Sequence, residues 1–364
     1  ETMQSRVFSD GVGEKSIYGF QWVSDDRFIY RPGLTNAKGR NMNSLVTFAV
    51  NVDGSKRKII GQQEMKGGQG SWTGMSVVDR LDSDPKHVIV SSNERRAFRD
   101  DFYKMNIFTG KKNLIAIGFV PKNAKGDRVY GTYRDQEGYP IATLVDESLD
   151  RVIYTYNKDS KEWSEHIRFT CQQPSFTPLA ATDKGWLVTG SKFSPSGELV
   201  EYNDTNALYL YDPETREFSE KLYQDPNYDV GGFTGTCRNA SGGAGVDYDT
   251  RKLLFVTYEA QEPVKIYFDD EIADIYNGLD AVFPNEWVSV VTRDKDRNKM
   301  VIRVSSPSNP GDYYFYNREQ SQLIPLYTYA PWIDRKIMAE TIPVKYTARD
   351  GLVIPAYLTL TKKK

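Results

Sequence analysis

The sequence is poor in the residues that build metal sites and disulfide frameworks. Its 364 residues include only two cysteines and two histidines. Cys171 and Cys237 lie 66 residues apart without neighbouring histidines, so they do not match the spacing of a structural zinc site. We interpret them as two free thiols, with a disulfide in an exported protein as the alternative. No metal or other cofactor is expected.

A positively charged region and a long apolar segment are also lacking. Lysine and arginine total 47 against 49 aspartate and glutamate residues, and the final Lys362-Lys363-Lys364 is too short for a phosphate-binding patch. Nucleic acid is therefore not an expected partner. No apolar run reaches the roughly 18 residues that a membrane-spanning helix needs, so no membrane partner is expected. Residues 1–20 lack the pattern of a signal peptide. The N-terminus reads as trimmed, which leaves the localisation open between cytoplasm and periplasm.

A sustained helical periodicity is missing as well. The best helical candidate is DDEIADIYNGL (269–279), which is one short segment. Aromatic residues, in contrast, make up 13% of the chain and include 24 tyrosines, a composition typical of strands. The expected fold class is therefore all-β.

What the sequence does contain is an internal repeat of two successive hairpins. The second hairpin of each repeat has a polar turn, such as Asp-Gly or Asn-Lys-Asp, between alternating apolar and polar residues. Its last residue before the turn recurs at intervals of 48 to 57 residues. These hairpins lie at 45–60, 102–117, 151–167, 207–222, 264–275 and 312–326, and the hairpins that precede them lie at 20–31, 129–145, 178–191, 244–258 and 288–306.

About four strands in each repeat of roughly fifty residues predict a β-propeller of four-stranded blades. One twisted four-stranded sheet cannot bury both of its faces, whereas a ring of such sheets can, because each sheet packs on the next. A pair of β-sandwiches is the alternative, but its strands would not recur at a constant interval. Six repeats are visible, and the segment before residue 20 is too short for a seventh.

Several segments carry a family resemblance. They are FQWVSDDRFIY (20–30), AVNVDGSKRKII (49–60), DPKHVIVSS (84–92), SSPSNPGDYYFYN (305–317) and PWIDRKIMAETIPVKYTARDGLVIPAYLTL (331–360). The most specific part is YTARDGLVIPAYLTL at the end of the last segment. Together these segments resemble the N-terminal propeller of serine peptidases of the prolyl oligopeptidase family, closest to the acylaminoacyl-peptidase-like branch. The similarity extends from about residue 18 to residue 360.

The resemblance implies a propeller over residues 1–337 and, at 338–364, the crossover and first hairpin of an α/β-hydrolase domain that is absent from this chain. In that family the propeller covers a Ser-Asp-His active site and admits only short peptides. The implied function is a noncatalytic propeller that gates the access of short peptides to its own C-terminal hydrolase domain. A free-standing propeller for protein or peptide interaction is the alternative, and a propeller glycosidase or lyase is a third.

The family has seven blades where this sequence shows six repeats. Either six blades contract to close the ring, or the ring stays open at its ends. We favour an open ring whose gap is filled by the displaced C-terminal tail or by a second copy, which would make the protein a homo-oligomer.

No residue is assigned to catalysis, cofactor binding or metal binding. The nucleophile motif G-x-S-x-G is absent, and NASGGAG (239–245), which has Asn239 in place of the first glycine, is interpreted as a flexible loop. His87 and His166 are expected to be structural, and DKDRNK (294–299) is expected to be a charged turn. The chain alone should therefore lack peptidase activity.

Adjacent carboxylates are also interpreted as structural. A glycosidase needs two carboxylates about 5 to 9 Å apart in one pocket, but neighbouring residues on a strand point to opposite faces. We expect solvated turns at Asp25-Asp26, Asp100-Asp101 and Asp269-Asp270. Substrate-binding residues are not assigned.

Overall fold

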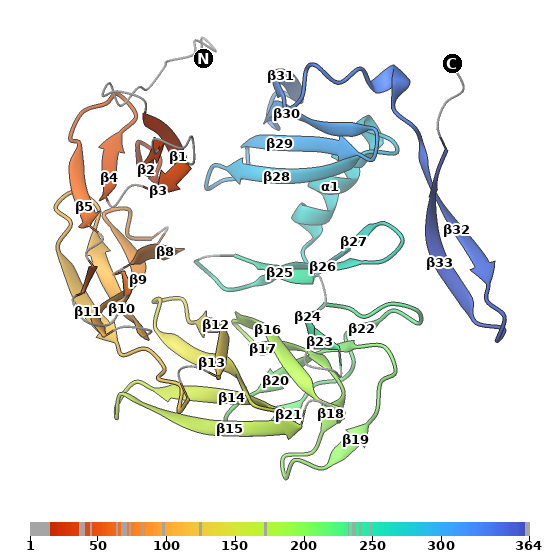
Figure 1. Cartoon of the computed structure of the whole chain (residues 1–364), viewed down its shortest axis with the longest axis horizontal. Helices are drawn as coiled ribbons and strands as arrows, with labels where there is room; N and C mark the ends of the chain where they lie inside the picture. Colours follow the sequence, from red (N-terminus) through yellow and green to blue (C-terminus); the bar gives the residue numbers. More distant parts are fainter. Residues whose placement is uncertain are drawn as a thin grey trace.

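A computed structural model describes residues 15–360 apart from short gaps at 36–40, 44–45, 63–64, 67–70, 73, 82, 97–98, 124–125, 171–172, 232, 235–237, 240–241 and 248. In these residues six antiparallel sheets follow one another along the chain and form a ring (Figure 1). The all-β propeller is therefore confirmed, with six blades, as the visible repeats indicate, and not the seven that the resemblance implies. Cys171 and Cys237 lie outside the described residues.

The first three blades each contain a path of four strands in chain order. Blade 1 consists of β1 (Lys15–Ser24), β2 (Arg27–Thr35), β4 (Val46–Asn51) and β5 (Lys58–Gln62), with β3 (Asn41–Asn43) paired to β2. Blade 2 consists of β8 (Met75–Arg80), β9 (His87–Arg96), β10 (Arg99–Asn106) and β11 (Lys112–Ala116). Blade 3 consists of β12 (Arg128–Arg134), β13 (Pro140–Glu147), β14 (Asp150–Asn157) and β15 (Glu162–Thr170).

The last three blades are less regular. Blade 4 consists of β16 (Phe176–Thr182), β17 (Gly185–Gly190), β20 (Ala207–Asp212) and β21 (Glu217–Phe218), with β22 (Tyr223–Gln224) also paired to β20. Blade 5 consists of β25 (Gly242–Val246), β26 (Leu253–Glu259) and β27 (Pro263–Tyr267), and blade 6 of β28 (Trp287–Arg293), β29 (Lys299–Ser306), β30 (Asn309–Asn317) and β31 (Gln322–Thr328). Three small hairpins pair β6 (Met65–Lys66) with β7 (Ser71–Trp72), β18 (Lys192–Phe193) with β19 (Leu199–Glu201), and β23 (Phe233–Thr234) with β24 (Arg238–Asn239).

Consecutive blades pack through clusters of buried apolar side chains. Val23 and Ile29 of blade 1 share one cluster with Val88 and Val90 of blade 2. Similar clusters join blade 2 to blade 3, blade 3 to blade 4, and blade 4 to blade 5. A middle blade therefore buries both faces against its neighbours, which removes the apolar surface that one isolated sheet would expose.

Blade 5 departs from the repeat because a helix follows its third strand. Residues Asp270–Val282 form α1, so the hairpin expected at 264–275 is wrong in its second half, whereas the helical candidate at 269–279 is confirmed. The Asp269 carboxylate begins the helix by accepting a hydrogen bond from the Ile272 amide at 3.1 Å. Apolar side chains at helical spacing then pack one face of α1 between blades 5 and 6. They are Ile272, Ile275, Tyr276 and Leu279.

The two ends of the ring meet differently from the other blades. Among the described residues, no cluster of buried side chains contains members of both blade 1 and blade 6. Tyr30 and Val50 are buried in a cluster of blade 1 alone. Side chains from both blades instead line one cavity, which is part of the site described below.

The residues after blade 6 form a hairpin separate from the blades. The 3₁₀ turn Arg335–Ile337 precedes β32 (Thr341–Thr347), which pairs with β33 (Val353–Thr359) in a two-stranded sheet. Figure 1 shows this hairpin beside blade 5, on the far side of the ring from β1. The Tyr357 hydroxyl donates to the backbone oxygen of Gln261 between β26 and β27. The expectation that the tail fills a gap at blade 1 is therefore wrong. A second copy at that gap, and the domain boundary between 1–337 and 338–364, stay predictions.

In the part of the chain that the structure describes, no helix is long and apolar enough to span a lipid bilayer.

Candidate functional site

A cavity of about 480 Å³ lies among the inner strands of the ring. Its wall is built from the end of β1 and the following turn, the end of β8, the strands β25 and β26, helix α1, and strands β28 and β29. Figure 1 shows β1, β8, β25 and β28 toward the middle of the ring. The cavity therefore occupies the place where the first two and the last two blades come together.

The cavity wall combines an apolar part with a charged part. Leu254 and Phe255 of β26, and Ile275 and Tyr276 of α1, supply apolar side chains. The charged part comes mainly from the turn between β28 and β29, which is the charged turn expected at 294–299. Within this turn the carboxylate of Asp294 accepts hydrogen bonds from the amides of Asn298 at 2.8 Å and Lys299 at 3.0 Å, so the prediction of a hairpin turn is confirmed.

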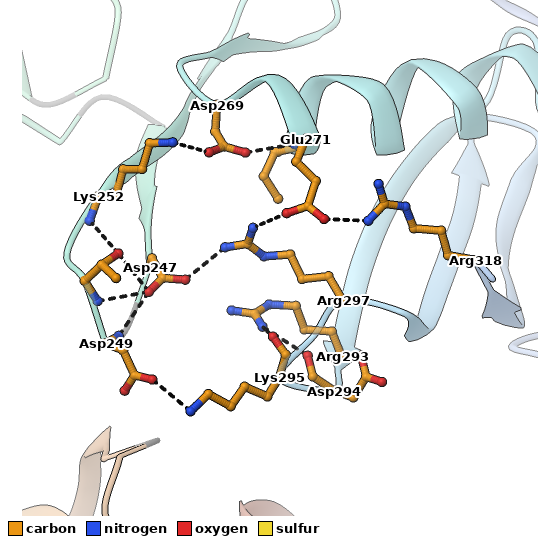
Figure 2. Close-up of polar contacts among 12 residues, drawn as sticks. Asp247, Asp249, Lys252, Asp269, Glu271, Arg293, Asp294, Lys295, Arg297 and Arg318 are labelled. Carbon is orange, nitrogen blue, oxygen red and sulfur yellow. Dashed lines mark hydrogen bonds and ion pairs between the residues drawn. The ribbon is translucent and has the colours of Figure 1, made fainter.

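Arg297 connects the two last blades through a network of ion pairs (Figure 2). Its guanidinium lies 2.9 Å from the carboxylate of Asp247 in blade 5 and 2.6 Å from that of Glu271 in α1. Glu271 also pairs with Arg318 of the turn between β30 and β31, at 2.5 Å. The hydrogen bonds from Arg318 and Arg297 lower the pKa of Glu271 despite its partial burial. Glu271 therefore stays ionised and holds both arginines in place.

Arg293 has a different set of partners. One of its terminal nitrogens donates to the backbone oxygens of Asp294 at 3.1 Å and Lys295 at 3.3 Å. Among the described residues it forms no ion pair with a carboxylate, although its neighbour Lys295 lies 3.3 Å from Asp249 (Figure 2). Arg293 is thus a cation at the cavity wall whose charge no carboxylate of the described residues neutralises by direct contact.

The turn between β25 and β26 crosses the middle of the ring. Its residue Arg251 has a left-handed backbone, with φ of 56°. The Arg251 guanidinium lies 2.8 Å from the carboxylate of Asp79 in blade 2 and donates to the backbone oxygen of Asp135 in blade 3, also at 2.8 Å. The side chain of Asp79 is only 3% exposed. Three blades are therefore connected across the inner space by one side chain.

The two histidines lie away from the cavity. His87 contacts the carboxylate of Asp84 at 2.9 Å on the surface of blade 2. His166 lies between blades 3 and 4, where its Nε2 is 2.7 Å from the hydroxyl of Tyr211. Burial, assisted by the nearby Arg216, lowers the pKa of His166 to about 4. Neither histidine lines the cavity, and their structural role stays a prediction.

Some of the adjacent carboxylates are buried, although solvated turns were expected at these positions. Asp101 is fully buried and accepts a hydrogen bond from the Gly118 amide at 2.9 Å, whereas Asp100 is exposed. Asp269 caps α1. Asp25 lines the cavity, while Asp26 accepts a hydrogen bond from the hydroxyl of Ser24 at 2.9 Å. The prediction of solvated turns is therefore wrong for Asp101 and Asp269, because each carboxylate is buried where it satisfies backbone amides.

The interpretation of the glycine-rich segment 239–245 as a loop is also wrong in part. The inner strand β25 (Gly242–Val246) begins inside this segment, where a flexible loop was expected, and it is the first strand of the hairpin expected at 244–258. Gly242 and Gly245 permit this because a Cβ at either position would lie 2.6 Å from the Thr257 oxygen or 2.4 Å from the Phe255 ring. The composition suggested a loop, but close packing in a strand can require the same residue type. Among the described residues, no group of three or more potential metal ligands is close enough to hold an ion.

The sequence interpretation did not identify Arg251, Arg293 or the partners of Arg297. Arg293 and Arg297 flank or belong to a turn that was correctly predicted, so the positive charge of that turn was a visible signal. The contact between Arg251 and Asp79 joins residues 172 positions apart, and no pattern of neighbouring residues predicts it.

Comparisons with known proteins connect this propeller to peptidases. The sequence matches no family model. It is 24% identical over 284 residues to dipeptidyl aminopeptidase BIII of Pseudoxanthomonas mexicana, a match that covers 76% of this chain and 37% of that protein. The structure is similar to prolyl oligopeptidase B from Galerina marginata bound to a 35mer hydrolysis and macrocyclization substrate, with a TM-score of 0.50 and 10% identity.

The chain spans less than half of either protein. The structural similarity covers 94% of this chain and 46% of the fungal enzyme, in agreement with the 37% coverage of the bacterial peptidase. At this identity the structural match shows a shared fold. Together, the shared propeller fold and the sequence similarity to a dipeptidyl aminopeptidase support a propeller domain of the prolyl oligopeptidase family.

Proposed function

We propose that this chain is the noncatalytic propeller of a serine exo- or oligopeptidase and gates the access of short peptides to a hydrolase active site. The observation that carries the proposal is the hairpin β32–β33, which resembles the first hairpin of such a hydrolase. It pairs with no blade in the described residues and exposes large apolar side chains. These include Ile342, Tyr346, Val353, Tyr357 and Leu358.

An isolated two-stranded hairpin is marginally stable in water. Further strands of a hydrolase sheet would pair with its edges and cover these side chains, so the hairpin is suited to join the propeller to its own C-terminal hydrolase domain. A free-standing interaction propeller, the alternative function, leaves the same apolar side chains without a partner.

Gating would follow from sterics. Of the five junctions between consecutive blades, four are packed directly by apolar clusters and α1 fills the fifth, whereas blades 1 and 6 share a cavity. The turn that carries Arg251 narrows the inner space further. A rigid, partly obstructed ring of this kind would exclude folded chains, whereas a short extended peptide could pass or dock.

The experiment compares this chain with the proposed longer protein, in which a hydrolase domain follows the hairpin. We expect the longer protein to cleave short chromogenic peptides, to lose this activity with a serine-directed phosphonate, and to cleave the same site far more slowly within a folded protein. We expect the chain alone to give no turnover. Phosphonate-sensitive turnover by the chain alone, or equal cleavage of the short peptide and the folded protein, would contradict the proposal.

A further inference from the structure

We propose that the cavity binds a carboxylate of a short peptide and that Arg293 is the residue that recognises it. This inference rests on the proposed function, because it takes peptides as the ligands. It adds a binding site within the propeller and a chemical preference for the peptide. The argument depends on the hydrogen-bonding capacity of Arg293, on the charges around it and on the apolar wall opposite.

Arg293 retains the donors that a carboxylate requires. A guanidinium has five N–H groups in a fixed plane. The hydrogen bonds of Arg293 within the described residues use only one terminal nitrogen, which donates to two backbone oxygens. These two contacts hold the guanidinium against its own turn. The remaining N–H groups at the cavity wall match the two oxygens of a carboxylate, which arginine binds in a bidentate manner.

The surrounding charges favour an anion over a cation. Arg297 is neutralised by Asp247 and Glu271, but Lys295 approaches a single carboxylate at 3.3 Å and its side chain is 63% exposed. Arg80 contributes a further positive charge to the wall. The acidic residues of the wall are Asp25 and Asp294, and the Asp294 carboxylate is already engaged by two backbone amides. The wall thus carries four basic side chains against two acidic ones. Two of the basic side chains, Arg297 and Lys295, already pair with carboxylates outside the wall, so Arg293 is the group on which anion binding depends.

The apolar part of the wall indicates what accompanies the carboxylate. Phe255, Ile275 and Tyr276 line the same cavity as Arg293, and Val290, near it on β28, also contributes. Burial of an apolar side chain against them is favourable by roughly 25 cal/mol for each Å² removed from water. The expected ligand is therefore a short peptide with a large apolar side chain next to a carboxylate. That carboxylate can be the C-terminus or an acidic side chain.

Fluorescence polarisation with three labelled pentapeptides tests the inference on this chain. The first is Gly-Ala-Ala-Ala-Phe with a free C-terminus, the second is its C-terminal amide, and the third is the amide of Gly-Ala-Ala-Asp-Phe. We expect one carboxylate-containing peptide to bind about tenfold more tightly than the plain amide. A hydrogen bond to a charged group changes a dissociation constant by about this factor. If the peptide with the free C-terminus binds more tightly, the site recognises a C-terminal carboxylate. If the aspartate-containing amide does, the site recognises an acidic side chain. Equal dissociation constants for all three peptides would overturn the inference.

Variants assign the recognition to Arg293. Arg293→Gln should remove the difference between the carboxylate peptide and the amide, and Arg293→Lys should retain part of it as a point charge. The matched control is Arg96→Gln, which changes an exposed arginine at the end of β9 and should leave the difference unchanged. Circular dichroism and the unfolding midpoint establish that each variant is folded. If both Arg293 variants keep the full preference, Arg293 is not the recognition residue.

A failure of this inference can be distinguished from a failure of the proposed function. In the proposed longer protein with its hydrolase domain, Arg293→Gln should raise KM for the carboxylate peptide, with kcat unchanged, and should leave KM for the amide unchanged. A protein without peptidase activity whose chain still binds the carboxylate peptide through Arg293 would refute the proposed function alone. An active peptidase that does not distinguish acid from amide would refute this inference alone.

Discussion

Single polar side chains between the blades carry contacts that the apolar clusters cannot make. Arg27 of blade 1 is fully buried and donates to the backbone oxygen of Ile107 in blade 2 at 2.9 Å. It also donates to Asn51 at 2.7 Å and lies over the ring of Phe108. Burial lowers the pKa of Arg27, with Asp26 acting in the opposite direction. Such residues set the position of one sheet relative to the next, because a buried donor must find its acceptor.

His166 provides a test at this scale through the pH dependence of stability. Burial lowers its pKa to about 4, below the usual value of about 6.5 in an unfolded chain. Between these two pH values the unfolded chain binds the extra proton, so the free energy of unfolding falls as the pH decreases from about 6.5 toward about 4. The contribution is at most about 3 kcal/mol, and less to the extent that water reaches the ring.

We therefore compare urea unfolding of the wild type and His166→Gln from pH 7.5 to 4.5. Glutamine can still bond to Tyr211 but does not titrate. The stability of the variant relative to the wild type should increase as the pH falls. A constant difference between the two proteins over this range would show that His166 is not held neutral by the fold.

At the scale of elements, helix α1 replaces a fourth strand in blade 5. Leu279 and Ile275 pack against blade 6, and Ile272 and Tyr276 against blade 5. One helix thus supplies the contact that a direct sheet-to-sheet cluster supplies at the four preceding junctions. The same helix places Glu271 in the ion-pair network of Arg297. The helix therefore both closes a junction and forms part of the cavity wall.

The helix cap is testable by substitution of Asp269. Its carboxylate accepts from the amide of Ile272 and pairs with Lys252 at 2.6 Å. Because the Lys252 side chain is 56% exposed, that ion pair contributes little, and the cap dominates. Asp269→Ala should lower the free energy of unfolding by about 1–2 kcal/mol.

Two further variants test whether the loss of the helix cap causes the destabilisation. Asp269→Asn keeps an oxygen for the cap and should recover most of the loss in urea unfolding, whereas Asp270→Ala, at an exposed neighbour, should have a smaller effect. If Asp270→Ala destabilises the protein as much as Asp269→Ala, the cap is not the reason.

At the scale of the whole molecule, the ring is stabilised across its centre as well as around its circumference. Arg251 reaches blades 2 and 3 from a turn of blade 5. The backbone of this residue also accepts a hydrogen bond from the Asp183 amide of blade 4, at 3.1 Å. The contact across the centre opposes an outward movement of blades 2 and 5, and it keeps the inner space partly obstructed.

A double-mutant cycle measures this contact. Arg251→Ala removes the closer of two arginines from the buried carboxylate of Asp79 and leaves Arg134, at 3.7 Å. We expect it to reduce stability by up to about 3 kcal/mol. Asp79→Asn in the same background should restore part of that loss, because the buried charge is then removed. Chemical denaturation of the wild type, both single variants and the double variant gives the coupling energy. Strictly additive effects would show that the two side chains do not interact.

The features that were predictable from the sequence arise from local interactions. The hairpins at 20–31, 151–167 and 288–306 were recognisable because alternation of side chains and turn residues are properties of neighbouring positions. The helix at 269–279 and the charged turn at 294–299 were visible for the same reason. The hairpin at 244–258 was recognisable too. That its first strand already begins at Gly242 was not, because a Cβ at Gly242 would meet the Thr257 oxygen and a Cβ at Gly245 the Phe255 ring, both on the adjacent strand.

The sequence by itself thus determined most of the hairpins and their repeat, and hence the propeller. Only the tertiary structure decided how α1 joins blades 5 and 6, where the C-terminal hairpin lies, and which charged side chains surround the cavity. The physical reason is the range of the interactions. Strand patterns depend on residues a few positions apart, whereas the site depends on contacts such as Arg251 with Asp79, across 172 positions, which exist only once the ring has formed.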